Sequence, residues 1–367
     1  MAAPDPATAR AAVYEGPGRL TVRDFPLPEL GPGDMLVAVE LAGVDGSEVH
    51  MFRGEIAAID AIAPVVFGDE ILGRVQAIGA QAAARRGLKP GDRVVVEARW
   101  PCADCRPCRE GNYYLCDHRW EKGGYGWMRA DAPPHLWGGY ATHVFVPADA
   151  LVYPVDADLP AETALVACSV LANSIYWTRT AGIGLGDPVA VIGPGPQGIG
   201  AALVAQLRGA DVVLAGLPRD AARLALARDL GVTRTVVLDG GDGAAQLRAA
   251  LGQDPAVVIE TAGAQPAKDL ALAAVRTGGR VVNCSVPPGP LSVDFTAVLL
   301  KQVTMQSPLA HPHTVPEALR LGQVLRARGQ DVGRMVSHVF ALDQAEEAVR
   351  TAGYETPESP VKVAIRP

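Results

Sequence analysis

The sequence predicts an α/β fold in two parts, a doubly wound parallel sheet and a small β-barrel. Strands and helices alternate after residue 160, which is typical of a parallel sheet with crossover helices. Before residue 154 the chain instead shows short strands separated by glycine and proline turns, without a long helical pattern. A length of 367 residues is enough for two domains with cores of their own.

We expect residues 1–158 and 309–367 to form the β-rich domain, with a nucleotide-binding domain inserted at 159–308. Strands of the β-rich part are expected at 10–14, 20–22, 35–41, 71–78, 93–97 and 137–146. In the inserted domain we expect strands at 189–192, 212–215, 235–238, 257–260, 280–284 and 303–306, and helices at 161–178, 199–207, 221–230, 243–251 and 266–275. Helices at 315–328 and 342–351 and a strand at 361–365 complete the chain.

A glycine turn follows the first strand of the inserted domain. Residues 189–192 are β-branched or apolar, as in a strand buried on both faces, and the next residues have G-x-G-x-x-G spacing. Such glycines permit a tight turn, the approach of backbone N–H groups to a pyrophosphate, and close packing of helix on strand. A glycine-rich turn without a ligand is the alternative, and the β-α alternation that follows argues against it. The residues expected at a dinucleotide are Gly193, Gly195, Gln197 and Gly198.

Composition and charge exclude several classes of protein. The net charge of −7 argues against a nucleic-acid partner, and the chain has no run of eighteen apolar residues that would span a membrane. The first ten residues lack the basic and apolar segments of a signal peptide. We therefore expect a cytoplasmic protein whose partner is a small-molecule substrate.

Four of the six cysteines lie in one short loop, with the pattern C-x2-C-x2-C-x7-C. Without an export signal, this clustering indicates metal ligation rather than disulfides. Four thiolates at this spacing suit tetrahedral zinc and leave no position for substrate, so the site should be structural. An iron–sulfur cluster or free thiols are the alternatives. The ligands are Cys102, Cys105, Cys108 and Cys116.

With these features the chain resembles the zinc-type medium-chain dehydrogenases/reductases, the superfamily of alcohol, polyol and threonine dehydrogenases. The resemblance covers nearly the whole chain and includes, in family order, Gly31-Pro32-Gly33-Asp34, Gly68-x-Glu70, Lys89-Pro90-Gly91-Asp92-Arg93-Val94, the four cysteines, Gly138-Gly139-Tyr140-Ala141 and the glycine turn. It implies a GroES-like catalytic domain, a Rossmann domain, hydride transfer with NAD(P), and a homodimer or homotetramer.

The chain departs from this family at its catalytic metal. Members with catalytic zinc carry a cysteine and a histidine where this sequence has Asp45 and Asp69, whereas Cys168 stands at the third ligand position. Glu70, which approaches the metal in relatives, is retained. So are Ser47 and His50, which resemble the family's proton relay. Cys168 has an ordinary alternative as a buried helical cysteine.

Three interpretations of this departure follow. In the first, the catalytic zinc is lost, because two carboxylates and one thiolate are a poor zinc site, and a protonated carboxyl or the Ser47–His50 pair handles the proton. Such an acidic pocket favours an amine, imine or amino-sugar substrate, or reduction of a conjugated C=C bond. In the second, Asp45, Asp69 and Cys168 or Glu70 hold a metal in a polyol or alcohol dehydrogenase. In the third, the chain is a non-catalytic nucleotide-binding relative.

The residues after the second strand of the inserted domain favour NADP(H), with NAD(H) as the alternative. Where NAD-binding relatives carry an acidic residue, this sequence has Pro218, followed by Arg219 and, one helical turn later, Arg223. Two guanidinium groups suit a 2′-phosphate. Asp220 is the exception, and we interpret it as the N-cap of the next helix.

Overall fold

The computed structural model describes residues 8–118, 124–357 and 359–367. The chain folds into two compact units, the first formed by the described residues up to Cys168 together with Val336–Pro367, and the second by Ser169–Met335. This division differs from the expected boundaries, because residues 309–335 pack within the second unit. There Thr314 donates a hydrogen bond to the carbonyl of Ala172 (2.9 Å), and Arg179 pairs with Glu317 (2.6 Å).

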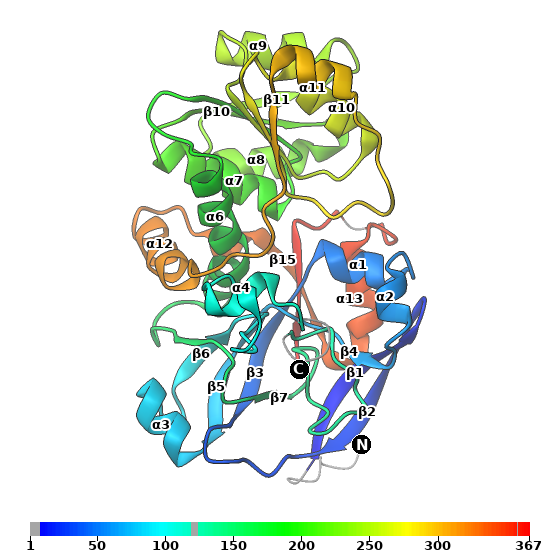
Figure 1. Ribbon diagram of the computed structural model, residues 1–367, viewed down its shortest axis with the longest axis vertical. Helices are drawn as coiled ribbons and strands as arrows, with labels where there is room; N and C mark the ends of the chain where they lie inside the picture. The colour runs from blue at the N-terminus through cyan, green and yellow to red at the C-terminus, as the bar shows by residue number, and fades with distance from the viewer. Residues whose placement is uncertain (1–7, 119–123, 358) are drawn as a thin grey trace. The chain divides into compact units, whose positions relative to one another are not determined.

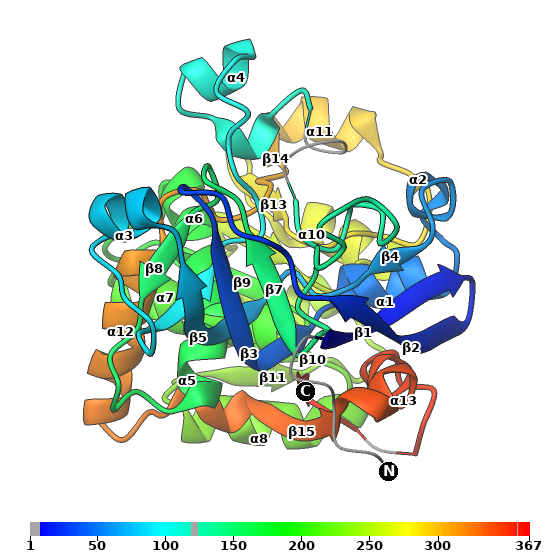
Figure 2. The ribbon, with the colours of Figure 1, turned by 90° about the horizontal axis from the view of Figure 1, so that it is seen from below.

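Two sheets form the first unit (Figures 1 and 2). The order β15-β16-β3-β5-β6-β8, with β7 also paired to β3, makes a seven-stranded sheet, and β2-β1-β4 makes a smaller one. The strands are β1 (Thr8–Gly16), β2 (Arg19–Pro26), β3 (Met35–Val44), β4 (Val65–Val66), β5 (Ile71–Ile78), β6 (Arg93–Val96), β7 (His143–Val146), β8 (Val152–Pro154), β15 (Val336–Ala341) and β16 (Lys362–Arg366). The helices are α1 (Gly46–Phe52), α2 (Ala57–Asp60), α3 (Ala80–Arg86), α4 (Arg106–Arg109), α5 (Ala161–Val166) and α13 (Ala345–Ala352).

This unit contains short helices that the sequence pattern did not predict, and one strand that is shorter than predicted. α1 and α3 have only seven residues each, too few to give a helical period. The expected strand at 137–146 begins only at His143. Residues 138–140 instead run against the chain after β4, where the N–H groups of Gly139 and Tyr140 donate to the carbonyls of Gly68 (2.7 Å) and Phe67 (2.9 Å).

A six-stranded parallel sheet of order β11-β10-β9-β12-β13-β14 forms the second unit (Figure 1), which confirms the predicted doubly wound fold. Apolar residues of α9 and α10 pack on alternate residues of β9, β10 and β12, as expected for strands buried on both faces. The strands are β9 (Pro188–Ile192), β10 (Asp211–Gly216), β11 (Thr235–Val237), β12 (Val257–Glu260), β13 (Arg280–Asn283) and β14 (Thr304–Gln306). The helices are α6 (Ala172–Thr180), α7 (Pro196–Leu207), α8 (Ala221–Asp229), α9 (Gly243–Leu251), α10 (Gln265–Ala274), α11 (Phe295–Lys301) and α12 (Val315–Ala327). Among the helices that the structure describes, none combines the length and the apolar character that a membrane crossing requires.

A buried arginine ties three segments of the first unit together. The guanidinium of Arg93 on β6 binds the carboxylate of Glu40 on β3 in a bidentate pair (2.9 and 2.7 Å), and it also donates to the carbonyl of Leu159. The Arg93 side chain is 4% exposed and that of Glu40 is 29% exposed. Water therefore replaces these bonds poorly when one partner is removed.

Replacing this arginine should destabilise the protein. We expect Arg93→Met to lower the free energy of unfolding by about 2 to 3 kcal/mol, because it removes the bidentate hydrogen bonds to the Glu40 carboxylate and the hydrogen bond to the Leu159 carbonyl. Arg74→Met is the matched control, since Arg74 lies 3.8 Å from the same carboxylate with its side chain 51% exposed. Urea unfolding curves of both variants test this, and equal effects would contradict it.

Candidate functional site

The four-cysteine loop lies around α4 and brings all four sulfurs together. Their Sγ atoms lie within 4.8 Å of one another, and the Cys102–Cys108 and Cys105–Cys116 pairs are each 3.9 Å apart. A tetrahedron of sulfurs about 2.3 Å from a zinc ion has edges of about 3.8 Å. The loop therefore has the donor set and the spacing that zinc requires.

Backbone groups in this loop point at the sulfurs. The N–H groups of Cys105 and His118 approach the sulfurs of Cys102 and Cys116 at 3.4 Å each. Hydrogen bonds from the backbone of Cys105 and Asp104 lower the pKa of the Cys102 thiol to about 6. These bonds favour the metal-binding thiolate form at Cys102, whereas burial raises the pKa of the Cys108 and Cys116 thiols.

Asp45 lies at the N-terminus of α1, and it acts there as the helix cap. Its side-chain oxygen accepts hydrogen bonds from the N–H of Glu48 (2.9 Å) and the hydroxyl of Ser47 (2.8 Å). The Glu48 carboxylate in turn accepts from the N–H of Asp45 (3.0 Å), which completes a reciprocal capping box. Asp45 thus performs a local structural task.

Asp69 and Glu70 immediately precede β5, and with Asp45 and a lysine from the far end of the chain they form a cluster of charged side chains. The ammonium of Lys362, on β16, lies 2.6 Å from the Glu70 carboxylate and 3.4 Å from the carbonyl of Val44. The Lys362 side chain is 2% exposed and that of Glu70 is 6% exposed. Burial and the nearby carboxylates of Asp45 and Glu70 raise the pKa of Asp69 well above its usual value.

The sequence motifs did not identify Glu48 and Tyr140 as neighbours of this cluster. The Glu48 carboxylate is buried and accepts hydrogen bonds from the N–H of Gly68 (2.8 Å) and the hydroxyl of Tyr140 (2.5 Å). Burial, with the charges of Asp45 and Asp69, raises the pKa of Glu48. The Asp-x-x-Glu spacing before an apolar run was the signal available for this cap.

Cys168 lies in a π-helical turn, Ala167–Leu171, that follows α5. Its thiol is buried and donates to the carbonyl of Leu165 (3.2 Å). Burial, with the negative charge of Glu70, raises the pKa of this thiol. Among the described residues, the four-cysteine loop is the one group of three or more Cys, His, Asp or Glu with converging ligand atoms. The ligand atoms of Asp45, Asp69 and Cys168 are therefore not gathered around one point in this structure.

The two members of the expected proton relay are both on α1, but each has its own carboxylate partner. Ser47 donates to Asp45, whereas the ring of His50 contacts the carboxylate of Glu55. Both residues are partly exposed. Transfer of a proton between Ser47 and His50 therefore needs a bridging water or ligand hydroxyl.

The glycine turn of the second unit has the close approaches that its spacing predicts. Gly193 has φ +104°, and a Cβ on Gly198 would lie 1.8 Å from the carbonyl oxygen of Gly193. Gly195 caps the N-terminus of α7, which leaves its first N–H groups available for phosphate. Gln197, on the first turn of α7, accepts a hydrogen bond from Asn173 (3.4 Å).

A hydroxyl group that follows the neighbouring strand β12 stabilises this turn. Its residue is not part of the glycine motif. Thr261, just after β12, donates to the carbonyls of Ile192 (3.0 Å) and Gly193 (2.9 Å). The carboxylate of Glu260 beneath it is fully buried, pairs with Lys268, and accepts the N–H of Gly263 (2.8 Å).

The two arginines after β10 differ in their surroundings. Arg219 is exposed, whereas Arg223 is buried and lies 3.2 Å from the carboxylate of Asp220. Asp220 occupies the N-cap position of α8, but its side chain accepts from the N–H of Leu217 (2.9 Å) rather than from the helix. Arg219 is therefore the guanidinium available at the surface.

Comparisons with known proteins agree with this geometry. The model of the alcohol dehydrogenase GroES-like domain matches residues 31–157, and that of zinc-binding dehydrogenase matches residues 196–323. A probable alcohol dehydrogenase of Mycobacterium tuberculosis is 40% identical over 282 residues, 76% of each chain. Sorbitol dehydrogenase of Rattus norvegicus is 30% identical over 356 residues, 96% of this chain and 95% of the rat protein.

Solved structures show the same fold. A putative zinc-binding dehydrogenase from Sinorhizobium meliloti, bound to NADP, is 27% identical with a TM-score of 0.82, covering 98% of this chain and 99% of that one. Alcohol dehydrogenase TADH from a Thermus species is 30% identical with a TM-score of 0.79, covering 97% and 99%. With its GroES-like and Rossmann parts and its matches along nearly the whole sequence, the chain belongs to the zinc-type medium-chain dehydrogenase/reductase family.

Proposed function

We propose that the protein is an NADP(H)-dependent oxidoreductase that transfers hydride to or from a small organic substrate without a catalytic zinc, and that it keeps a structural zinc in the four-cysteine loop. Membership of the family supports NAD(P)-dependent oxidoreduction in general. The observation that carries the finer proposal is the cluster of charged side chains Asp45, Asp69, Glu70 and Lys362.

Three properties of this cluster disfavour the binding of a zinc ion. The Asp45 oxygen that caps α1 already accepts two hydrogen bonds. The ammonium of Lys362 lies against Glu70 and places a positive charge among the groups that would bind a cation. The thiol of Cys168 donates to the carbonyl of Leu165 (3.2 Å), and among the described residues its sulfur does not converge with the ligand atoms of Asp45 and Asp69. Two hard carboxylates with one thiol are a poor donor set for zinc.

The charges of this cluster also indicate which class of substrate it suits. Asp69 and Glu48 have raised pKa values, and the cations Lys362 and Arg99 both act on Asp69. The cluster thus carries less negative charge than Asp45 and Asp69 alone indicated. We therefore favour an uncharged acceptor, a carbonyl or a conjugated C=C bond, over an amine, imine or amino sugar.

Reduction of such an acceptor needs a proton as well as a hydride. The nicotinamide supplies the hydride, and the proton must come from a side chain that is protonated near neutral pH. Asp69 is the candidate for this role, because burial and two neighbouring carboxylates raise its pKa and so favour its neutral form. We assign Asp69 as the general acid, with Ser47 and His50 as the route by which protons exchange with solvent.

The zinc content separates this proposal from its main alternative, a polyol or alcohol dehydrogenase that binds metal through Asp45, Asp69 and Cys168. We expect one zinc per chain from protein purified without chelators, measured by elemental mass spectrometry. Cys105→Ser should lose this zinc, because three thiolates hold the ion less tightly. Two zinc ions per chain, one of them retained in Cys105→Ser, would contradict the proposal and favour the alternative.

Asp69→Asn tests the general acid. Turnover with NADPH and a panel of carbonyl and enone substrates should fall by about 10²- to 10⁴-fold. The wild-type rate of reduction should fall as pH rises through the raised pKa of Asp69, because the carboxyl then loses its proton, and the variant should lack this decline. Asp24→Asn, an exposed carboxylate on β2, serves as the control. An unchanged pH profile in Asp69→Asn would overturn the assignment.

Arg219→Ala tests the preference for NADP(H). The exposed guanidinium suits a 2′-phosphate, and losing a charge-assisted hydrogen bond should raise the Kd for NADP(H) about 10- to 100-fold while leaving that for NAD(H) unchanged. Arg228→Ala, an exposed arginine later on α8, is the matched control. Titration by cofactor fluorescence gives both constants, and equal losses for the two cofactors would contradict the preference.

We further propose a cytoplasmic homodimer or homotetramer, as the family resemblance implies. Apolar side chains on α11 support association with a second copy, since Phe295, Leu299 and Leu300 are 72%, 74% and 76% exposed. In the sheet order β14 is an end strand next to β13, so its outer edge offers backbone groups to another copy. The six cysteines, all reduced, suit a cytoplasmic location.

A further inference from the structure

The segment after α1 turns back towards the helix, so that the carboxylate of Glu55 lies beside His50 on α1. Gly54 has φ +74°, and this left-handed turn allows the N–H of Glu55 to donate to the carbonyl of His50 (2.9 Å). A Cβ on Gly54 would lie 2.6 Å from the ring of Pro17, so a glycine is needed for this path. The backbone thus fixes where the Glu55 side chain begins.

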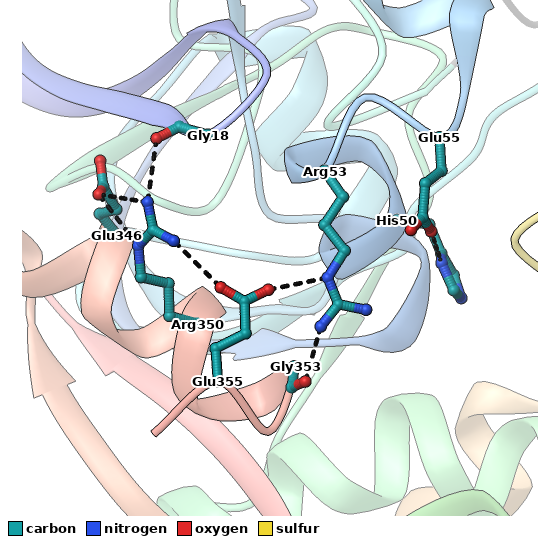
Figure 3. A network of polar contacts seen from close by, with 8 residues as sticks. All are labelled: Gly18, His50, Arg53, Glu55, Glu346, Arg350, Gly353 and Glu355. Carbon is teal, nitrogen blue, oxygen red and sulfur yellow. Dashed lines mark hydrogen bonds and ion pairs between the residues drawn. The ribbon is translucent and has the colours of Figure 1, made fainter. Parts of the chain in front are cut away.

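The Glu55 carboxylate contacts the Nδ1 atom of the His50 ring (Figure 3). A carboxylate only accepts hydrogen bonds, so in the neutral ring the proton must sit on Nδ1. The Nε2 atom then carries the lone pair that can take up a proton. Side-chain exposure is 19% for His50 and 29% for Glu55, so the pair is in contact with solvent but partly shielded from it.

The other charged groups around this pair have partners of their own. Arg53 binds Glu355 (2.8 Å) and the carbonyl of Gly353 (2.7 Å), as Figure 3 shows. Arg350, on α13, binds Glu346 and Glu355 (each 3.0 Å) and the carbonyl of Gly18. From α2, Asp60 accepts the hydroxyl of Tyr14 (2.5 Å). Among the described residues, Glu55 is thus the charged group that contacts the imidazole.

The same ion pairs hold α1 against α13. Arg350 also lies 5.0 Å above the ring of Phe52, the last residue of α1. The His50 ring therefore stands on a helix that is anchored at its C-terminal end, and its orientation depends on the Glu55 contact rather than on movement of the helix. This arrangement is the one by which a carboxylate orients a histidine for proton transfer.

We propose that Glu55 is a positioning residue, which holds the His50 ring in the Nδ1–H form so that Nε2 exchanges the proton of the reaction with solvent. In oxidation Nε2 takes up the proton that Asp69 has accepted from the substrate, and in reduction it returns a proton towards Asp69. The proposal rests on the proposed function, in which His50 belongs to the proton route.

Nitrogen-15 NMR of the zinc-loaded full-length protein tests the positioning directly. The chain has seven histidines, and the ring signals of His50 are those lost in His50→Asn. At about pH 8.5, where a histidine ring is neutral, we expect the Nδ1–H form in the wild type and in Glu55→Gln, whose amide oxygen still accepts. Glu55→Ala should shift the ring towards the Nε2–H form. An unchanged ring in Glu55→Ala would overturn the proposal.

Turnover separates this proposal from the proposed function. With NADPH and the best substrate of the panel, Glu55→Ala should lower kcat about tenfold and raise the solvent deuterium isotope effect. Glu355→Gln, which alters a carboxylate of the same network without touching His50, should change neither. If His50→Asn has full activity, the proton route of the proposed function is wrong, although the NMR result still decides the role of Glu55. If His50→Asn is impaired and Glu55→Ala is not, the proposal itself fails.

Discussion

The reciprocal cap between Asp45 and Glu48 is the interaction on which the candidate site of the first unit depends. It fixes the start of α1, and α1 carries both Ser47 and His50. The same Glu48 carboxylate accepts the N–H of Gly68, the residue before Asp69, and so ties the helix to the chain that leads into β5. Removal of either carboxylate would therefore disturb several functional groups together.

The cap also explains how an acidic residue is tolerated at position 45. A carboxylate at a helix N-terminus is stabilised by unpaired N–H groups, whereas the same charge in an apolar pocket would be costly. The remaining carboxylates are accommodated in other ways: Glu70 pairs with the ammonium of Lys362, and the raised pKa of Asp69 favours its neutral form. Each acidic side chain thus has a separate physical reason to be there.

Short sequence motifs predicted those features whose residues lie close together along the chain. The G-x-G-x-x-G spacing identified a turn in which a Cβ at Gly198 would strike Gly193, and the cysteine spacing identified four sulfurs that converge. Lys362 escaped prediction because it meets Glu70 only after the last strand pairs with β3, at a separation of almost 300 residues. Arg223 was expected at the cofactor but lies buried against Asp220, since periodicity places a residue on a helix without deciding which neighbour its side chain will bind.

The closeness of the four sulfurs carries a chemical liability. Two thiols 3.9 Å apart are separated by about twice the length of a disulfide bond, so a small movement of a surface loop joins them once no ion lies between them. The loop is half-exposed, and the lowered pKa of Cys102 supplies the nucleophile for such a bond. Loss of the ion in oxidising surroundings would therefore lock the loop in a form that metal alone does not reverse, and a reductant would have to act first.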